Sequence, residues 1–359
     1  MIIWKIDNSI IKFLTIDICE KLLFLGRAPL RISFAGGGTD LEEYHNNFDG
    51  YAITFTINLF TYVMAKLRND CKFQGFSPDF ASHHPPKNFK KIQPVQGHEI
   101  VVTTLREMGF KKGVDIFFSS DVPPGSGLGA SSALTTNLVN ILCYLQGKNW
   151  SKSKIAMKAY EIGHNKLRWN VGKQDEFSSV YGGLNLLKFT KNEVCVEQLN
   201  LNKSTLQELK NNSMLFFIGK RKSSSEKVLR KMDEEIIHGN NKTIQALHHA
   251  KELALELRDA LKQNNLTQFG EIISKGWDEK KKFTNLVSNN YLDSIIEMAK
   301  KNGAEGIKIP GAGGGGYLYI YAPPSSHDRI VHNLKKHDIK RINFDYQFNG
   351  TVVIDTNKL

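Results

Sequence analysis

The sequence lacks the commonest signature of a nucleotide-binding loop. None of its Gly-Lys pairs is followed by Ser or Thr, so the P-loop pattern G-x-x-x-x-G-K-[ST] is absent. Residues 125–130 match the dinucleotide pattern G-x-G-x-x-A, but two prolines precede it. The carboxylate that this fingerprint needs about 20 residues later is also missing. These absences disfavour a P-loop enzyme and leave an NAD-dependent oxidoreductase only as an alternative.

Cysteine is scarce, and long apolar runs are missing. The four cysteines, at positions 19, 71, 143 and 195, form no C-x-x-C pair, which is typical of isolated thiols in a reducing compartment. We therefore expect a cytoplasmic protein. Charged residues interrupt the mildly apolar first 25 positions, which excludes a signal core or a membrane span of roughly 20 residues there. Residues 1–24 are predicted to be a short N-terminal extension.

Acidic residues are fewer than basic ones. The 359-residue chain is long enough for two domains, and its 48 Lys and Arg against 36 Asp and Glu give a net charge of +12. This balance suits anionic partners such as phosphorylated metabolites or nucleic acid. The basic residues occur in short scattered groups, without zinc-finger spacing or an aromatic-rich RNA-binding signature. A nucleic-acid-binding protein therefore remains a minor alternative, and no membrane partner is expected.

The most informative segment that is present is a glycine-rich loop at residues 122–134. It joins a strand-like run at 114–120 to an amphipathic helix-like run at 133–145. Glycines 125, 127 and 129 have no Cβ, so backbone N–H groups can approach phosphate oxygens, and the following helix N-terminus adds partial positive charge. Ser131 and Ser132 offer hydroxyls to a phosphate, to Mg²⁺, or simply to the helix N-terminus as caps.

The rest of the chain alternates strand and helix patterns and has no repeat or low-complexity linker. Strands are predicted at 24–34, 51–67 and 214–218, with a strand pair near 182–199, and residues 76–98 resemble a long loop. Helices are predicted at 98–108, 130–146, 151–168, 223–238, 241–262, 266–282 and 290–301. A glycine-rich turn at 306–316 leads into a strand, and a helix with one or two short strands follows. The pattern predicts two α+β units with a cleft between them.

Three glycine-rich turns, at 36–38, 125–129 and 311–316, exceed what simple turns require. Together with their flanks, at 27–40, 123–132 and 308–316, they resemble in order the three motifs of the GHMP small-molecule kinases. The first motif, ending Ser-Phe-Ala-Gly-Gly-Gly-Thr-Asp, is most similar to that of the heptose 7-phosphate kinases within this family. The match covers most of the chain. Where mevalonate kinases have the first Ser of Gly-Leu-Gly-Ser-Ser, this sequence has Ala130.

The resemblance implies a two-domain α+β fold with the active site between the domains. Residues 25–200 would form an N-terminal ATP-binding domain similar to ribosomal protein S5, and residues 201–359 a ferredoxin-like C-terminal domain. The implied activity is ATP- and Mg²⁺-dependent phosphorylation of the anomeric hydroxyl of a heptose 7-phosphate. An unphosphorylated sugar such as fucose or galactose is the alternative acceptor. The expected partners are therefore small molecules, and a homodimer is left open.

The resemblance also assigns roles to single residues. Asp175 would be the catalytic base, Arg31 would stabilise the transferred phosphoryl group, and Ser131 with Glu161 would bind Mg²⁺. The residues implied to bind ATP are Pro124, Gly125, Ser126, Gly127, Leu128, Gly129, Ala130, Ser131 and Ser132. Those implied to bind the sugar are Gly37, Gly38, Thr39, Asp40, Lys173, Gly313 and Gly314.

Plain structural roles compete with several of these assignments. Asp175 could be a helix N-cap and Asp40 a favourable charge at a helix N-terminus. Glu161 could lie on a solvated helix face, and Arg31 could be a surface residue at the end of a strand. Lys173, Arg168 and Lys308 are candidates to bind an acceptor that already carries a phosphate, but a lysine-rich chain offers many similar candidates.

Overall fold

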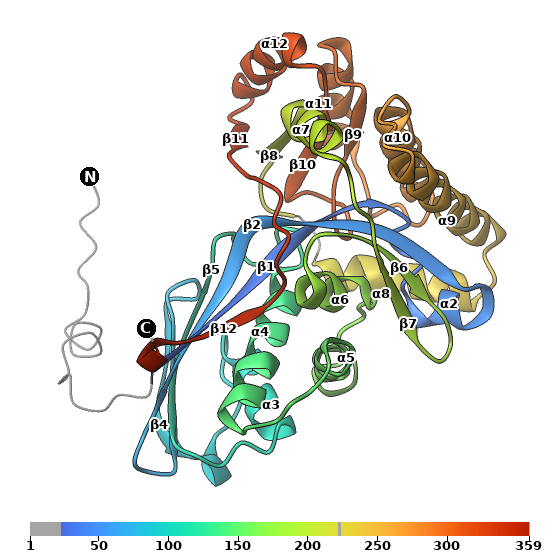
Figure 1. The fold of residues 1–359 in the computed structure, drawn as a ribbon. Coiled ribbons are helices and arrows are strands. Elements are labelled where there is room, and N and C mark those ends of the chain that lie inside the picture. Colours follow the sequence, from blue (N-terminus) through green and yellow to red (C-terminus); the bar gives the residue numbers. More distant parts are fainter. Residues whose placement is uncertain (1–22, 222–223, 359) are drawn as a thin grey trace.

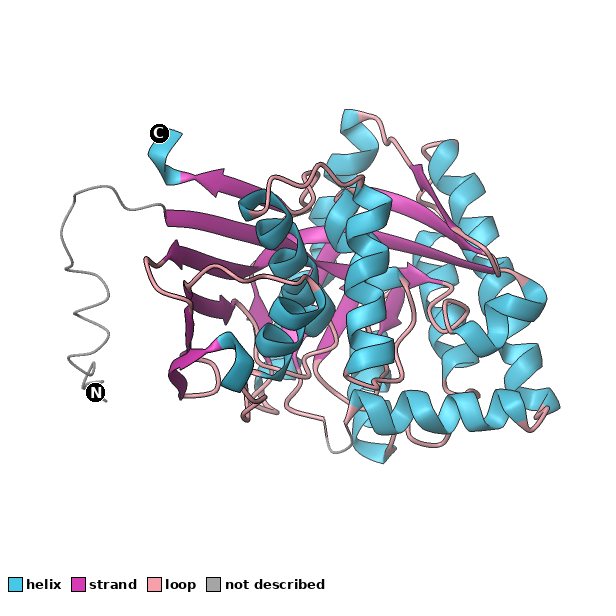
Figure 2. Ribbon diagram, turned by 90° about the horizontal axis from the view of Figure 1, so that it is seen from below, coloured by secondary structure: helices cyan, strands magenta, loops and turns pink. Residues whose placement is uncertain are grey.

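A computed structural model describes residues 23–221 and 224–358 of the chain. The predicted N-terminal extension thus lies outside the described residues, apart from its last two positions, which already belong to the first strand. The strands form one eight-stranded sheet and one four-stranded sheet within these ranges. Figure 2 shows the long strands of the large sheet as a continuous layer with helices packed against it.

The large sheet is almost entirely antiparallel. Its main path runs β12 (Val352–Asp355), β1 (Leu23–Ala35), β2 (Gly50–Leu67), β5 (Val114–Ser120), β3 (Lys72–Ser77) and β4 (Ser82–Asn88). The pair β3 and β5 is parallel, and the other described pairs are antiparallel. Dinucleotide-binding folds need a mostly parallel sheet. The NAD-dependent alternative is therefore wrong.

Strand β2 spans 18 residues and pairs with three strands, one of which is β1. Its first part pairs with β6 (Leu184–Phe189), which continues to β7 (Val194–Gln198), and its last part pairs with β5. Its sequence is rich in Thr, Ile, Phe, Tyr and Val, which favour strands because branched and aromatic side chains pack well on a pleated surface. This long strand therefore connects β6 and β7 to β5, the strand that leads into the glycine-rich loop before α4.

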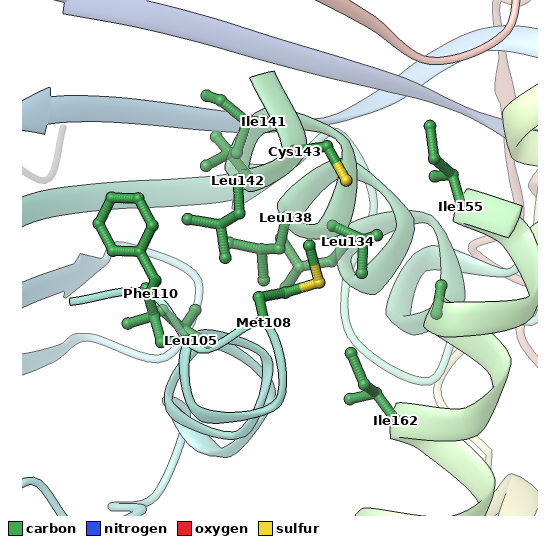
Figure 3. Close-up of a cluster of buried hydrophobic side chains, with 14 of the residues drawn as sticks. Leu105, Met108, Phe110, Leu134, Leu138, Ile141, Leu142, Cys143, Ile155 and Ile162 are labelled. Carbon is green, nitrogen blue, oxygen red and sulfur yellow. The ribbon is translucent and has the colours of Figure 1, made fainter. Parts of the chain in front are cut away.

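Helices cover one face of the large sheet. They are α3 (Glu99–Glu107), α4 (Ala130–Leu145), α5 (Lys152–Glu161) and α6 (Gln174–Tyr181). Apolar side chains recur along α4 at the spacing of a buried helical face, with Leu134, Leu138, Ile141 and Leu142 in the core. Figure 3 shows them packed against α3 and α5. Burying one such side chain stabilises the fold by about 1.5–3 kcal/mol, so the loop that precedes α4 has a rigid base.

The second unit is built around the sheet β11-β8-β10-β9. Its strands are β8 (Ser213–Phe217), β9 (Gly306–Lys308), β10 (Tyr317–Tyr321) and β11 (Lys340–Ile342). Its helices are α7 (Lys203–Asn212), α8 (Ser225–Ile237), α9 (Asn241–Lys262), α10 (Phe269–Lys280), α11 (Asn290–Lys301) and α12 (Pro324–Lys335). None of the helices in the described part of the chain is long and apolar enough to cross a membrane.

The end of the chain returns to the first unit. Strand β12 pairs antiparallel with β1, and Figure 1 shows it running along that strand. The predicted C-terminal domain of residues 201–359 is therefore too long at its end. The sequence pattern did not predict this pairing, because it joins strands from opposite ends of the chain.

Most predicted elements are confirmed, and two differ. Strands β3 and β4 form a hairpin where a long loop was expected, although β4 contains two prolines. Proline is tolerated there because β4 is an edge strand and needs fewer backbone donors. The helix predicted at 151–168 ends at Glu161 and continues as a π-helical turn, Ile162–Lys166. Such turns rotate the following side chains and often lie near functional sites.

Candidate active site

A cavity of about 260 Å³ lies between the two units. It is lined by the glycine-rich loop before α4, the turn after β1, the start of α6, helices α8 and α10, and the loop after β9. All three glycine-rich segments identified in the sequence therefore contribute to a single cavity.

The loop before α4 has the backbone that its glycines permit. Gly125, Gly127 and Gly129 have φ values of 75°, 89° and 79°, in the region that other residues rarely adopt. A Cβ on Gly127 would lie 2.2 Å from Nη2 of Arg221, and one on Gly129 would lie 3.1 Å from Oδ2 of Asp175. The glycines thus let two charged side chains approach the loop closely.

Seven of the nine residues predicted to bind ATP line this cavity: Gly125, Ser126, Gly127, Gly129, Ala130, Ser131 and Ser132. The other two are not part of the cavity wall, and their assignment to ATP stays a prediction. Pro124 is exposed, and the Leu128 side chain is fully buried in the core. The N-cap of α4 is Gly129, and no side chain caps this helix. Ser131 and Ser132 are therefore not caps.

Arg31 and Asp175 form an ion pair beside the loop, in which Arg31 is buried and the Asp175 side chain is 21% exposed. The Nε of Arg31 donates to Oδ1 of Asp175 at 2.7 Å, and its Nη2 lies 2.6 Å from the same oxygen. Its Nη1 donates to the carbonyl of Gly127 at 2.9 Å. The Arg31 side chain is 3% exposed, so it is not a surface residue. Asp175 lies in the first turn of α6, whose N-cap is Lys173, so the N-cap interpretation of Asp175 is wrong.

Asp40 joins the turn after β1 to α6. Its Oδ1 accepts hydrogen bonds from the N–H of Gly38 at 2.9 Å and from Nε2 of Gln174 at 3.1 Å. Its Oδ2 accepts from the N–H of Gln174 at 3.2 Å. Burial raises the pKa of Asp40, and nearby Asp175 raises it further. A buried carboxyl with these contacts can bind a sugar hydroxyl at the cavity wall.

Among the other predicted sugar contacts, Gly37 and Gly38 line the cavity, but Thr39 does not. The Thr39 hydroxyl donates to the carbonyls of Gly36 at 2.8 Å and Tyr51 at 2.9 Å. Thr39 therefore holds the turn in shape, and its assignment as a sugar contact is wrong.

Lys173 and the third glycine-rich segment are also corrected by the structure. The Nζ of Lys173 pairs with Oε1 of Glu42 at 3.1 Å, and Lys173 is absent from the cavity wall. Gly313 and Gly314 are not part of the cavity wall, and the N–H of Gly314 donates to the carbonyl of Val287 at 2.7 Å. The preceding Gly311 and Ala312 line the cavity in their place.

Glu161 is not part of the cavity wall, so the structure does not bring this predicted magnesium ligand to Ser131. Its side chain is 47% exposed and lies 3.6 Å from Nζ of Lys158. The interpretation as a solvated helix face is the correct one. An acidic neighbour of the serine pair is Glu176, which hydrogen-bonds Ser132, and burial raises the pKa of Glu176 to about 8.

The residues present fit a magnesium ion that arrives with a nucleotide. Within the described chain, no cluster of three or more His, Cys, Asp or Glu side chains could hold a metal ion alone. Mg²⁺ commonly takes only one or two protein ligands and fills the rest of its shell with phosphates and water. The hydroxyls of Ser131 and Ser132 line the cavity, and Oε2 of Glu176 is buried without a described hydrogen-bond partner.

Sequence reasoning missed two basic residues of the cavity, Arg221 and Lys280. Burial lowers the pKa of Arg221 to about 10, and its Nη2 is buried without a described hydrogen-bond partner. Burial also lowers the pKa of Lys280 well below its usual value. Both occur in runs of basic residues, so the sequence carried no signal that separates them from surface lysines and arginines.

Models of one known family match parts of both units of the chain. The model of the GHMP kinase N-terminal domain matches residues 97–183, and that of the GHMP kinase C-terminal domain matches residues 257–340. The chain therefore belongs to the GHMP kinases, which use ATP, and it is a sugar kinase of this family.

Individual proteins that are similar to the chain are also sugar kinases. The chain is 29% identical over 320 residues to D-glycero-alpha-D-manno-heptose 7-phosphate kinase of Campylobacter jejuni, covering 86% of this chain and 92% of that one. Its fold is similar to that of a D-glycero-D-manno-heptose 1-phosphate kinase from Bacteroides thetaiotaomicron, with a TM-score of 0.76, 23% identity, and coverage of 92% and 98%. It is also similar to Lactococcus lactis galactokinase complexed with galactose, with a TM-score of 0.75, 17% identity, and coverage of 97% and 98%.

Proposed function

We propose that this sugar kinase transfers the γ-phosphate of ATP to the anomeric hydroxyl of D-glycero-D-manno-heptose 7-phosphate, which gives the 1,7-bisphosphate. The observation that carries the proposal is the Arg31–Asp175 ion pair between the glycine loop and Asp40, in one cavity. The heptose 7-phosphate kinase of Campylobacter jejuni, similar over most of both chains, supports this acceptor. The product would enter nucleotide-activated heptose synthesis for surface polysaccharide.

Each group has a role in this proposal. The backbone of residues 125–129 and the N-terminus of α4 bind the triphosphate, because the N–H groups and the helix dipole favour anions. Asp175 accepts the proton of the attacking hydroxyl, and Arg31 offsets charge that develops on the phosphoryl oxygens. Asp40 binds another hydroxyl of the sugar. Mg²⁺, held by Ser131 and the nucleotide, would neutralise phosphate charge that otherwise repels the nucleophile.

A comparison of acceptors tests the proposal. Steady-state turnover is measured with heptose 7-phosphate, the free heptose, fucose and galactose at saturating ATP. We expect the highest kcat/KM with heptose 7-phosphate. Equal or better use of a free sugar would reject this acceptor in favour of a fucose- or galactose-like one.

A thermal-shift panel separates the kinase from the nucleic-acid alternative. ATP with Mg²⁺ and an oligonucleotide are compared as ligands. A ligand at 100 times its dissociation constant adds about 2.7 kcal/mol to the free energy of unfolding. We expect this stabilisation from ATP with Mg²⁺ alone.

The serine pair gives a separate prediction about the metal. Ser131→Ala should weaken the dependence on Mg²⁺, because it removes a hydroxyl ligand at the cavity wall. The half-saturating Mg²⁺ concentration, measured at fixed ATP, should rise, and Ser132→Ala serves as the comparison. An Mg²⁺ titration unchanged in Ser131→Ala and shifted in Ser132→Ala would transfer the role to Ser132.

A further inference from the structure

Two lysines face the cavity from the second unit, one with a buried side chain (Lys308) and one with a partly buried side chain (Lys280). Lys280 is the last residue of α10, and Lys308 is the last residue of β9. Both line the cavity, and Lys308 is 5% exposed. Their positions on two different elements bring two ammonium groups to the same wall.

Neither ammonium group has an acidic partner. The Nζ of Lys280 donates to the carbonyls of Ile309, at 3.2 Å, and Gly311. The Nζ of Lys308 donates to the carbonyl of Phe34 at 2.8 Å. Among the described residues, no carboxylate forms a salt bridge with either. Two ammonium groups carry six N–H donors, of which these bonds use three, so three (6 − 3) remain for a ligand.

This arrangement is unfavourable without an anion. Burying a cation costs free energy unless a counter-charge accompanies it. Burial and, to a lesser extent, the nearby Arg31 lower the pKa of Lys308 to about 7. Lys308, Arg221 and Arg31 add to the effect of burial on Lys280, and Asp40 opposes it. A bound anion would reverse this penalty, so the pair is suited to an anionic ligand.

The position of the pair indicates which anion this is. The carbonyl that Lys308 binds belongs to Phe34, two residues before the turn that leads to Asp40. That turn is the one we assign to the sugar. The triphosphate is assigned to the loop before α4, where Arg31 and Arg221 provide the positive charge. Lys308 therefore lies on the acceptor side of the cavity, and Lys280 shares the cavity wall with it while its Nζ donates to Gly311, which packs against Gly127 of the loop.

We propose that Lys280 and Lys308 bind the phosphate group that the acceptor sugar already carries, and that they set the preference for a sugar phosphate over a free sugar. This inference rests on the proposed function, since it presumes a phosphorylated acceptor. It replaces Lys173, whose ammonium is paired with Glu42 outside the cavity wall.

Lys280→Met tests the inference, because methionine keeps the length of the side chain and removes its charge. Losing a hydrogen bond to a charged group should raise the KM for heptose 7-phosphate by about 10- to 100-fold. The KM for ATP and the turnover of free heptose should stay within about twofold of the wild type, since neither involves the second phosphate. Lys282→Met is the matched control, as Lys282 is exposed and pairs with Glu279.

Two outcomes would overturn the inference. One is a raised KM for ATP with an unchanged KM for heptose 7-phosphate, which would place the nucleotide on the pair. The other is no change in either KM. These results differ from failure of the proposed function, which the wild type alone would reveal by using a free sugar as well as heptose 7-phosphate.

Inorganic phosphate provides a test that needs no variant to fold. In the wild-type enzyme it should inhibit competitively against heptose 7-phosphate and not against ATP. Competition with ATP alone would reject the assignment. If Lys280→Met folds, as judged by thermal unfolding, this inhibition should weaken in parallel with the binding of heptose 7-phosphate.

Discussion

Asp175→Asn should lower kcat by about 10²- to 10⁴-fold, because the variant loses the group that accepts the proton of the attacking hydroxyl. The amide keeps the size of the side chain and an oxygen that can accept from Nε of Arg31. ATP binding should therefore stay close to normal. Single-turnover rates and calorimetric ATP titrations measure the two effects separately.

Asp259→Asn is the control for the loss of a carboxylate. Asp259 pairs with Arg258 on α9, and its side chain is 56% exposed, far from the cavity wall. Its kcat should equal that of the wild type. Near-normal turnover of Asp175→Asn would remove Asp175 as the base. A large loss of ATP affinity would instead point to a role in nucleotide binding.

Arg31→Met should lower kcat by about 10³-fold, within the range found when an arginine that offsets transition-state charge is absent in other phosphotransferases. The guanidinium contacts both Asp175 and the carbonyl of Gly127, so the variant loses the link between the base and the phosphate loop. Arg31→Lys should recover only part of the activity, because an ammonium cannot make the same forked contacts. Steady-state kinetics with ATP and the sugar phosphate measure both variants.

Arg27→Met is the matched control on the same strand. The guanidinium of Arg27 lies 4.4 Å from the centre of the Phe60 ring and does not line the cavity. Its loss should affect stability more than kcat. Full activity of Arg31→Met, with an unchanged melting temperature, would contradict the role given to Arg31.

Much of the fold was predictable because local patterns and tertiary contacts agree. The apolar spacing in α4 predicts the buried face that the structure shows, and the residues of β2 predict a long strand. The β3–β4 hairpin was not predictable, because an edge strand with two prolines has no clear local pattern. The return of β12 to β1 depends on a contact between the two ends of the chain, which no local pattern encodes.

The sequence by itself determined the glycine-rich segments, their order, and the candidates Arg31, Asp40 and Asp175. Glycines without a Cβ leave a recognisable local pattern, because backbone conformation and close approach depend on the residue itself. Only the tertiary structure decided which charged side chains face the cavity. Glu161 and Lys173 lie close to Asp175 in the sequence, but their side chains do not line the cavity. Glu161 contacts Lys158, and Lys173 contacts Glu42. Lys280 and Arg221 come from distant helices and loops, and the packing of the two units brings them to the site.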